Sequence, residues 1–292
     1  MTLYTQVETN KRKTFFYIFL FLVFIIFLGW IFSWIYDSQI ILYIAVVISI
    51  SQALSSYYIG DRIALAISHA VPAKREEYTE LHRLVENLAL TAGLPKPDVY
   101  IIPDDAPNAF ATGRDPKHAS VAVTRGLLNI LEKKELEGVI SHELAHIGNR
   151  DSLLMVVVVV LVGVISILSD FFLRMRFWGL GDSRDRNSSV PILIIALAIS
   201  ILAPIAAVLI QLAISRKREF MADASGALLT RYPQGLADAL KKLSSDKRQI
   251  KYANDSTSLL YISNPMKRKS WISNLFSTHP PAEERIALLE KM

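Results

Sequence analysis

Long apolar stretches separated by polar ones dominate the pattern of the chain. Four of them are about twenty residues long, at residues 15–35, 40–59, 153–173 and 192–214. That length lets a helix cross a hydrocarbon core of about 30 Å. Neither Lys nor Arg occurs in any of them, and Asp170 is their only acidic residue. The pattern therefore predicts four transmembrane helices.

The four helices are expected to pair as two hairpins. Only the short break Asp37-Ser38-Gln39 separates the first two, which predicts an N-terminal hairpin over residues 1–59. The third stretch contains five consecutive valines, as a buried strand could, but strands rarely exceed about ten residues. A second hairpin is expected over residues 153–214, with a kink at Pro204. The alternative for this second pair is a helix buried against the domain.

Lysine and arginine are distributed unevenly around the apolar stretches. Three precede the first stretch, eleven lie between the second and third, four lie between the third and fourth, and fourteen follow the fourth. None lies in the turn of the first hairpin. Because cytoplasmic flanks of membrane helices carry the excess of positive charge, the N-terminus and both large polar blocks are expected in the cytoplasm.

The two polar blocks, residues 60–152 and 215–292, together hold about 170 residues, which is enough for one domain with its own core. We expect a single α+β domain that the second hairpin interrupts. Residues 74–93 have apolar positions at helical spacing, and a second helix is expected over residues 132–147. Between them we expect short strands of a small sheet, at residues 99–102, 109–112 and 120–124.

Composition narrows the possible chemistry. Hydrophobic residues make up 52% and charged residues 20% of the 292-residue chain, which favours a membrane protein and excludes a disordered one. Because there is no Cys, disulfide scaffolds, Cys-based zinc sites and thiol nucleophiles are excluded. The basic residues behind the net charge of +5 concentrate beside the apolar stretches, which favours contact with anionic lipid over nucleic-acid binding.

The run His142-Glu143-Leu144-Ala145-His146 carries the strongest chemical signal. Positions four apart share one face of a helix, so His142 and His146 can present two imidazole nitrogens to one metal ion. Zinc lowers the pKa of a bound water to about 7, and the carboxylate of Glu143 can take its proton as it attacks a peptide carbonyl. The alternative is a chance pair of His residues on an amphipathic helix.

A catalytic zinc site needs a third protein ligand and one open position. Ser152 stands where the metzincin pattern has a third His, so that class is excluded. Glu219 and Asp223 are four apart and share a helical face, so Glu219 can bind the metal while Asp223 accepts a hydrogen bond from a ligand imidazole. The alternative is an exposed acidic pair that neutralises Arg216 and Arg218.

The order of these motifs resembles that of the HtpX-like membrane zinc metallopeptidases, relatives of the CAAX prenyl proteases. The resemblance runs from the N-terminal hairpin through HELAH and SRKREFMAD to THPPAEER, which ends at Arg285. It implies a gluzincin-like domain that holds one zinc ion per subunit through His142, His146 and Glu219. Glu143 would be the catalytic base, and Asp223 would accept a hydrogen bond from a ligand imidazole. The resemblance also implies proteolysis of misfolded or damaged membrane proteins in bacterial envelope quality control, at the inner membrane.

Three further residues match elements of that family. Asn108, in Asn108-Ala109-Phe110, adjoins a strand that would pair with substrate, while His279 and Arg285 belong to the His-Pro-Pro element and its continuation. The resemblance therefore implies substrate or transition-state contacts for all three. His279 could donate to the oxyanion of the tetrahedral intermediate, or it could simply precede a helix that starts at the following prolines. A structural role is predicted for the remaining histidines, His69, His82 and His118.

The sequence thus predicts a mostly helical, α+β membrane protein with a cytoplasmic zinc endopeptidase domain that binds polypeptides. An extended substrate could add to a sheet edge at residues 108–112 or 120–124. One alternative is a CAAX-type peptidase that trims prenylated peptides, although the short chain argues against the larger chamber of that branch. Another is a non-catalytic zinc-stabilised scaffold or chaperone, although a structural site normally has four protein ligands. The oligomeric state is not indicated.

Overall fold

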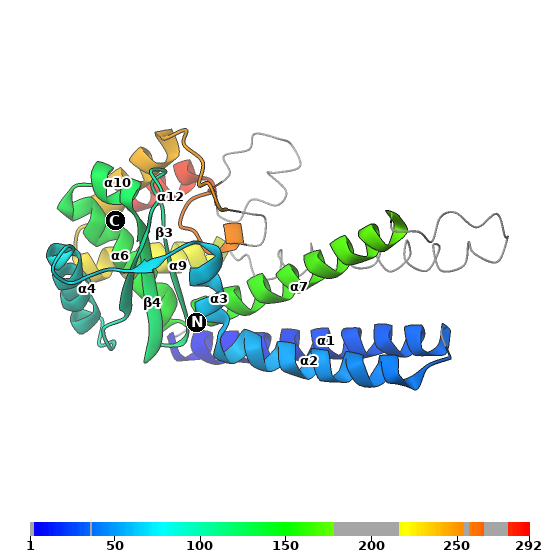
Figure 1. The fold of residues 1–292 in the computed structure, drawn as a ribbon. Helices are drawn as coiled ribbons and strands as arrows, with labels where there is room; N and C mark the ends of the chain where they lie inside the picture. The colour runs from blue at the N-terminus through cyan, green and yellow to red at the C-terminus, as the bar shows by residue number, and fades with distance from the viewer. Residues whose placement is uncertain (1–2, 36, 178–215, 254–256, 266–279) are drawn as a thin grey trace.

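The computed structural model describes residues 3–35, 37–177, 216–253, 257–265 and 280–292. Two sequence predictions, the fourth apolar stretch at residues 192–214 and the role of His279, lie outside these residues. The described chain consists of a helical hairpin and a further long helix that leave the same side of an α+β domain (Figure 1).

The N-terminal hairpin consists of α1 (Leu3–Ile35) and α2 (Gln39–Tyr58). The helices approach closely at Gly29, where an added Cβ would overlap the Cβ of Ala45. Many large apolar side chains of the hairpin, Phe19 and Trp34 among them, are exposed. The segment Val7–Trp34 and the whole of α2 are long and apolar enough to cross a membrane, as the sequence predicts.

The domain is built from both polar blocks. The first block forms α3 (Gly60–Ile67), β1 (Val71–Pro72), α4 (Thr79–Thr91), β2 (Asp98–Ile102), β3 (Ala109–Asp115), β4 (His118–Thr124), α5 (Arg125–Ile130) and α6 (Lys133–Gly148). The second block forms α9 (Arg216–Thr230), α10 (Pro233–Ser245), the 3-10 helix η2 (Thr257–Leu259) and α12 (Ala282–Leu289). Because α9 and α10 pack on α6, the two blocks form a shared core.

The strands of the described residues form one sheet in the order β1-β2-β4-β3. β2 and β4 run parallel, whereas the other neighbours are antiparallel. The three predicted strands are confirmed as β2, β3 and β4. Because β4 has a neighbour on each side, the expectation that residues 120–124 could offer a free edge is wrong. β3, with residues 109–112, is one of the two edge strands, and β1 is the other.

The observed starts of the two predicted helices of the first block agree with the prediction to different degrees. α6 begins one residue after the predicted start, and a capping box formed by Glu132 and Glu135 fixes its first turn. The helix predicted from residue 74 begins only at Thr79, because residues 74–78 form a separate turn in which Tyr78 N–H donates to Lys74 O. It ends as predicted before Gly93, which has a φ of +67°.

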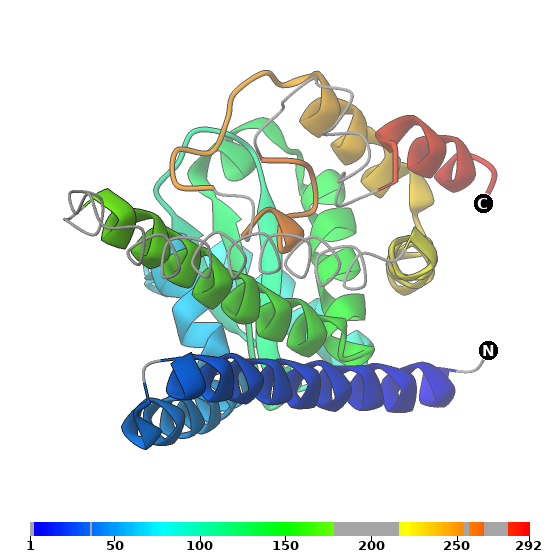
Figure 2. The same cartoon turned by 90° about the vertical axis from the view of Figure 1, so that its right-hand side faces the viewer.

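The sheet separates two hydrophobic cores, and alternate residues of its strands face one core or the other. Phe110 and Ala122 face a core shared with α1 and the third long helix, α7 (Asp151–Phe177). Ala109, Ala111 and Val121 face the opposite core, which includes residues of α4, α6 and α10. Figures 1 and 2 accordingly show α1 and α7 on one side of the sheet. The sheet is thus covered by helices on both faces.

α7 confirms that the third apolar stretch is helical, but half of it does not face lipid. The side chains of residues 153–162 are buried against β3, α1 and α3. Of α7, the part Asp151–Ile165 passes the length and composition test for a span together with α6, from which it is bent by 81°. The described residues therefore contain two candidate spans, or three if the bent pair counts as one. Of the four predicted spans, the first two are therefore candidate spans by length and composition, the third is one only as part of the bent pair, and the fourth lies outside the described residues.

Candidate metal centre and active site

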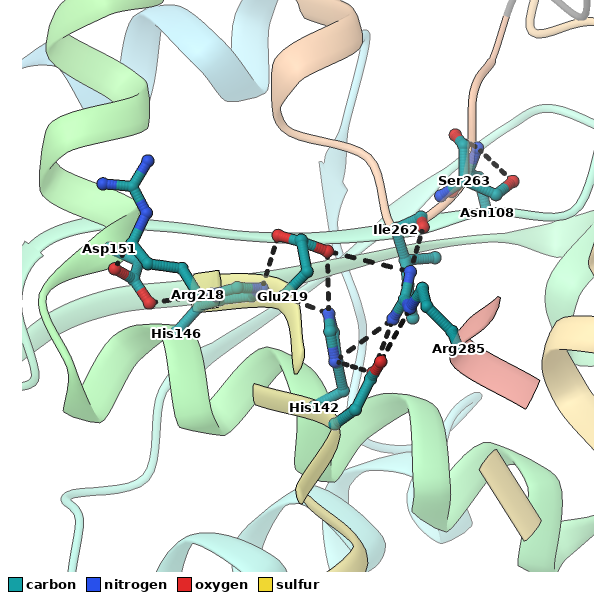
Figure 3. Close-up of polar contacts among 10 residues, drawn as sticks. Asn108, His142, His146, Asp151, Arg218, Glu219, Ile262, Ser263 and Arg285 are labelled. Atoms are coloured by element: carbon teal, nitrogen blue, oxygen red, sulfur yellow. Dashed lines mark hydrogen bonds and ion pairs between the residues drawn. The ribbon is translucent and has the colours of Figure 1, made fainter. Parts of the chain in front are cut away.

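Two helices bring three ligand-type side chains together inside the domain. α6 carries His142 and His146, α9 carries Glu219, and all three side chains are buried. The close approach depends on Gly226 of α9, where an added Cβ would lie 3.0 Å from the backbone nitrogen of His142. Figure 3 shows the Glu219 carboxylate directed at both imidazoles.

The candidate ligand atoms are spaced as one bound metal ion requires. The two Nε2 atoms of His142 and His146 lie 3.1 Å apart. The Glu219 carboxylate oxygens lie 3.8 Å from the first and 3.6 Å from the second of these nitrogens. Ligands of a tetrahedral zinc ion with bonds of about 2.0–2.1 Å lie ~3.3 Å apart. The three side chains therefore fit one zinc-sized ion with only small movements.

Carboxylates behind the imidazoles decide which ring nitrogen faces the centre. Nδ1 of His142 donates to Asp223 Oδ1 at 2.9 Å, and Nδ1 of His146 donates to Asp151 Oδ2 at 3.1 Å. A neutral imidazole with its hydrogen on Nδ1 has a lone pair at Nε2. Two lone pairs that face each other repel unless a metal ion or a shared proton lies between them. With both Nδ1 atoms held by carboxylates, both Nε2 atoms are available to one metal ion.

The two imidazoles differ in basicity when no metal is bound. Burial lowers the pKa of His142 to about 4, although the hydrogen bond to Asp223 opposes this shift. Burial also lowers the pKa of His146, but Asp151 and Glu219 more than offset it and raise the value to about 9. At neutral pH the metal-free His146 thus carries a second proton, on Nε2, where it can be shared with His142 Nε2, and a divalent cation would displace it.

Glu143 follows His142 on α6 and is buried as well. Its carboxylate accepts a hydrogen bond from the backbone N–H of Ala111 in the edge strand β3. Burial raises the pKa of Glu143 to about 7, while the neighbouring His146 lowers it. A carboxylate with a pKa near neutral can take up a proton and release it again at the same pH, as a general base and acid must.

Arg285 of α12 is buried behind His142 (Figure 3). Its Nε and Nη2 donate to the two oxygens of Asp223 at 2.8 and 2.6 Å, and Nη1 donates to the Ile262 carbonyl at 3.2 Å. Burial alone would raise the pKa of Asp223, but Arg285 and His142 lower it to about 2. These contacts favour a role for Arg285 in orienting Asp223 over the predicted contact with substrate.

Asn108 lies just before β3 and is held by a short segment of the second block. Its side-chain amide donates to the Ser263 carbonyl at 2.9 Å, and its carbonyl oxygen accepts from Ala109 N–H at 3.1 Å. The next backbone bond, from Ile262 N–H to the Ala109 carbonyl, extends this pairing along the edge of β3. Asn108 thus helps to fix one end of the edge, and its contact with substrate stays a prediction.

Two buried residues on the other side of the centre, Asn10 and Asp151, were not predicted from the sequence. Arg218 is buried beside them, and because Glu219 and Asp223 are buried too, the alternative of an exposed acidic pair is wrong. Asp151 follows α6 after a turn in which Arg150 has a φ of 61°, and this turn directs α7 so that its first residue reaches His146. The five-residue spacing from His146 to Asp151 could have been noticed. Asn10 gives no local signal, because it lies more than 130 positions from its partners.

The histidines predicted to be structural lie among other contacts. His82 Nε2 lies 2.9 Å from the Ala73 carbonyl oxygen, and His118 pairs with Asp115. His69 stacks on the ring of Tyr252. Within the residues that the structure describes, none of the three belongs to a metal-ligand group.

A helical membrane hairpin joined to a domain with a buried His/His/Glu group and an adjacent glutamate defines a membrane metalloprotease. The chain belongs to peptidase family M48, whose family description matches residues 75–292. It is 47% identical to a "Protease HtpX homolog" of Thermoanaerobacter pseudethanolicus, over 100% of this chain and 98% of that protein. It is 43% identical to a protein of the same name from Listeria monocytogenes, over 99% of this chain and 100% of that protein.

The fold is also similar to a solved structure. Ste24p of S. mikatae superposes with a TM-score of 0.51 at 21% identity, covering 99% of this chain and 66% of that one. At this identity the likeness concerns the fold alone.

Proposed function

We propose that this protein is a zinc-dependent endopeptidase that hydrolyses peptide bonds in membrane proteins, with misfolded or damaged chains as its substrates. The observation that carries the proposal is the convergence of His142, His146 and Glu219 beside the buried Glu143. Only three protein ligands converge among the described residues. This favours a catalytic site with an open position over a closed structural one.

Zinc held by these ligands would supply a Lewis acid that polarises the scissile carbonyl and makes water more acidic. Glu143 accepts the proton of the attacking water and later returns a proton to the leaving amine nitrogen. Asp223 and Asp151 hold the ligand imidazoles in the tautomer that directs Nε2 at the metal. No covalent intermediate with the protein is required.

We place the substrate along β3. Ala109 of this edge strand is already bonded through its carbonyl to Ile262, so the part of the edge that can accept a peptide starts beyond it. Ala111 is the next residue on that side, and its N–H contacts Glu143. An extended substrate bonded here would lie directly beside the candidate base. Backbone pairing of this kind selects extended, unfolded segments and not a particular sequence.

We further assign residues 60–152 and 215–292 to one peptidase domain, which residues 153–214 interrupt as a second membrane hairpin. The excess of Lys and Arg in these blocks supports a domain facing the cytoplasm and a multi-pass protein of the bacterial inner membrane. A substrate unfolding in the bilayer would then reach β3 from the cytoplasmic membrane surface.

Two variants of the full-length protein in detergent test the catalytic assignment. Glu143→Gln is expected to keep stoichiometric zinc and lose proteolysis of an unfolded membrane protein by about 100-fold or more, because the general base is removed. His142→Ala is expected to lose both zinc and proteolysis. Zinc is measured by metal analysis and cleavage by gel assay with a chelator control.

Matched substitutions guard against nonspecific effects. One control is Glu137→Gln, because Glu137 lies on the same helix as Glu143 and its carboxylate pairs with Lys134. The other is His118→Ala, which changes an exposed histidine. Both should behave as the unchanged protein. Undiminished cleavage by Glu143→Gln would end the proposal, and bound zinc without any cleavage by the unchanged protein would favour the scaffold alternative.

A further inference from the structure

A second buried polar cluster lies behind His146 and joins three helices. Asp151, the first residue of α7, accepts from His146 Nδ1 through Oδ2 and from the Asn10 side-chain amide through Oδ1, at 2.7 Å. Asn10 belongs to α1, the first candidate membrane span. Arg218 of α9 places its Nε 3.5 Å from Asp151 Oδ1. All three residues are at most 3% exposed.

This cluster mirrors the one behind His142. There, Asp223 accepts from the imidazole and is held by Arg285 of α12. Here, Asp151 accepts from the imidazole and is held by Arg218 and Asn10 (Figure 3 shows Asp151 and Arg218). In both clusters a carboxylate orients a ligand imidazole and a cation accompanies the carboxylate. Only the cluster behind His146 includes a residue of α1.

The contacts of Asn10 are suited to fixing the position of Asp151. Its Nδ2 donates to Asp151 Oδ1 and also to the Asn149 carbonyl, at 2.9 Å. The amide therefore bonds to both sides of the turn between α6 and α7. Arg218 supplies charge but cannot fix this geometry as firmly. Among the described residues, its guanidinium nitrogens have no hydrogen-bond partner. A buried carboxylate needs directional donors to hold one orientation, and here they come from Asn10 and His146.

We infer that Asn10 is a positioning residue for the metal ligand His146 and acts through Asp151, so that packing of α1 against the domain completes the high-affinity metal site. The inference rests on the proposed metal centre. It gives the N-terminal membrane helix a part in the chemistry besides anchoring the domain. Removal of partners that orient a metal-bound histidine typically weakens metal affinity by roughly 10- to 100-fold.

A double-mutant cycle in the full-length protein tests this inference. The zinc dissociation constant is measured by competition with a chromophoric chelator for the unchanged protein, Asn10→Ala, Asp151→Ala and the double variant. Each single change is expected to weaken zinc binding by roughly 10- to 100-fold. Because Asn10 acts through Asp151, the double variant should be no weaker than Asp151→Ala alone.

The matched control is Thr14→Ala, one turn further along α1. Thr14 is buried like Asn10, but its hydroxyl bonds to the Asn10 carbonyl within the helix. Its zinc dissociation constant should stay unchanged. Asn10→Ser, which is too short to reach Asp151 but keeps a polar group, should reproduce the loss seen with Asn10→Ala. Visible absorption of the cobalt-substituted proteins should shift for both Asn10 variants and not for Thr14→Ala.

The outcomes separate this inference from the function on which it rests. If the unchanged protein binds no zinc, the proposed metal centre fails. If it binds zinc and the Asn10 variants bind it equally well, only the positioning role is overturned. Equal losses in Thr14→Ala, or additive losses in the double variant, would likewise overturn it, because α1 would then act through general packing.

Discussion

At the scale of single residues, Arg285 allows a sharp test between two roles. Its guanidinium bonds both oxygens of the buried Asp223, which orients His142. Arg285→Leu leaves that carboxylate buried without its cation, although His142 Nδ1 still donates to it, so we expect the free energy of unfolding to fall by about 3–5 kcal/mol. Zinc binding should weaken at the same time. Arg285→Lys, whose ammonium cannot span both oxygens, should give a smaller loss of each.

Chemical unfolding and zinc competition measure these effects, and Arg83→Lys on the exposed face of α4 is the control. Unchanged unfolding and zinc affinity together with reduced proteolysis would contradict this expectation. Such a result would return Arg285 to the role that the sequence resemblance implies, a contact with substrate or transition state.

The residue scale also shows how far a sequence can specify this site. His142, His146 and Glu143 are recognisable because one helix sets their spacing. Glu219 and Asp223 follow from the same four-residue rule on a second helix, once a third ligand is sought. Asn10 could not be found, since its partners come from the α6–α7 corner and only tertiary packing joins the two regions.

At the scale of elements, the contact between α6 and α9 sets the position of Glu219. Gly226 allows that contact, because an added Cβ would lie 3.0 Å from the His142 nitrogen and 3.3 Å from its Cα. Gly226→Val should therefore push α9 away, lower the free energy of unfolding by about 1–3 kcal/mol and weaken zinc binding at least 10-fold. Thermal unfolding and zinc competition measure the two effects.

Gly148→Ala is the matched control, since an added Cβ there meets Leu94 only at ordinary van der Waals distance, 3.8 Å. It should leave zinc affinity unchanged. If Gly226→Val lowers stability but binds zinc as the unchanged protein does, the position of Glu219 does not depend on this helix contact.

The elements also show what apolar patterning can and cannot predict. Short segments bounded by Pro, Asp and Gly predict β2, β3 and β4. They cannot say that β4 lies inside the sheet, because strand order depends on the crossover between β2 and β4. Likewise, the valines of α7 are as apolar as a membrane helix requires. Composition alone cannot distinguish burial against β3 and α1 from burial in lipid.

At the scale of the whole molecule, both open ends of the N-terminal hairpin lie at the domain. α1 contacts the α6–α7 corner through Asn10, near its start. α2 ends at Tyr58, whose carbonyl accepts from Arg114 of β3 at 3.2 Å while the Arg114 guanidinium lies 5.7 Å from the Tyr58 ring centre. In the proposed multi-pass arrangement, the turn between the helices would lie across the membrane from the domain.

This arrangement can be tested cleanly because the chain contains no Cys. In Gln39→Cys the single thiol lies at the exposed hairpin turn, and in Glu76→Cys it lies on the domain surface. With a membrane-impermeant maleimide on intact spheroplasts, Gln39→Cys should be labelled and Glu76→Cys should react only after the membrane is opened. This expected result follows from the excess of Lys and Arg beside the domain, on which the proposed orientation rests. The reverse labelling would overturn the cytoplasmic orientation and leave the hairpin intact, whereas labelling of both thiols from outside would mean that α1 and α2 do not span the membrane.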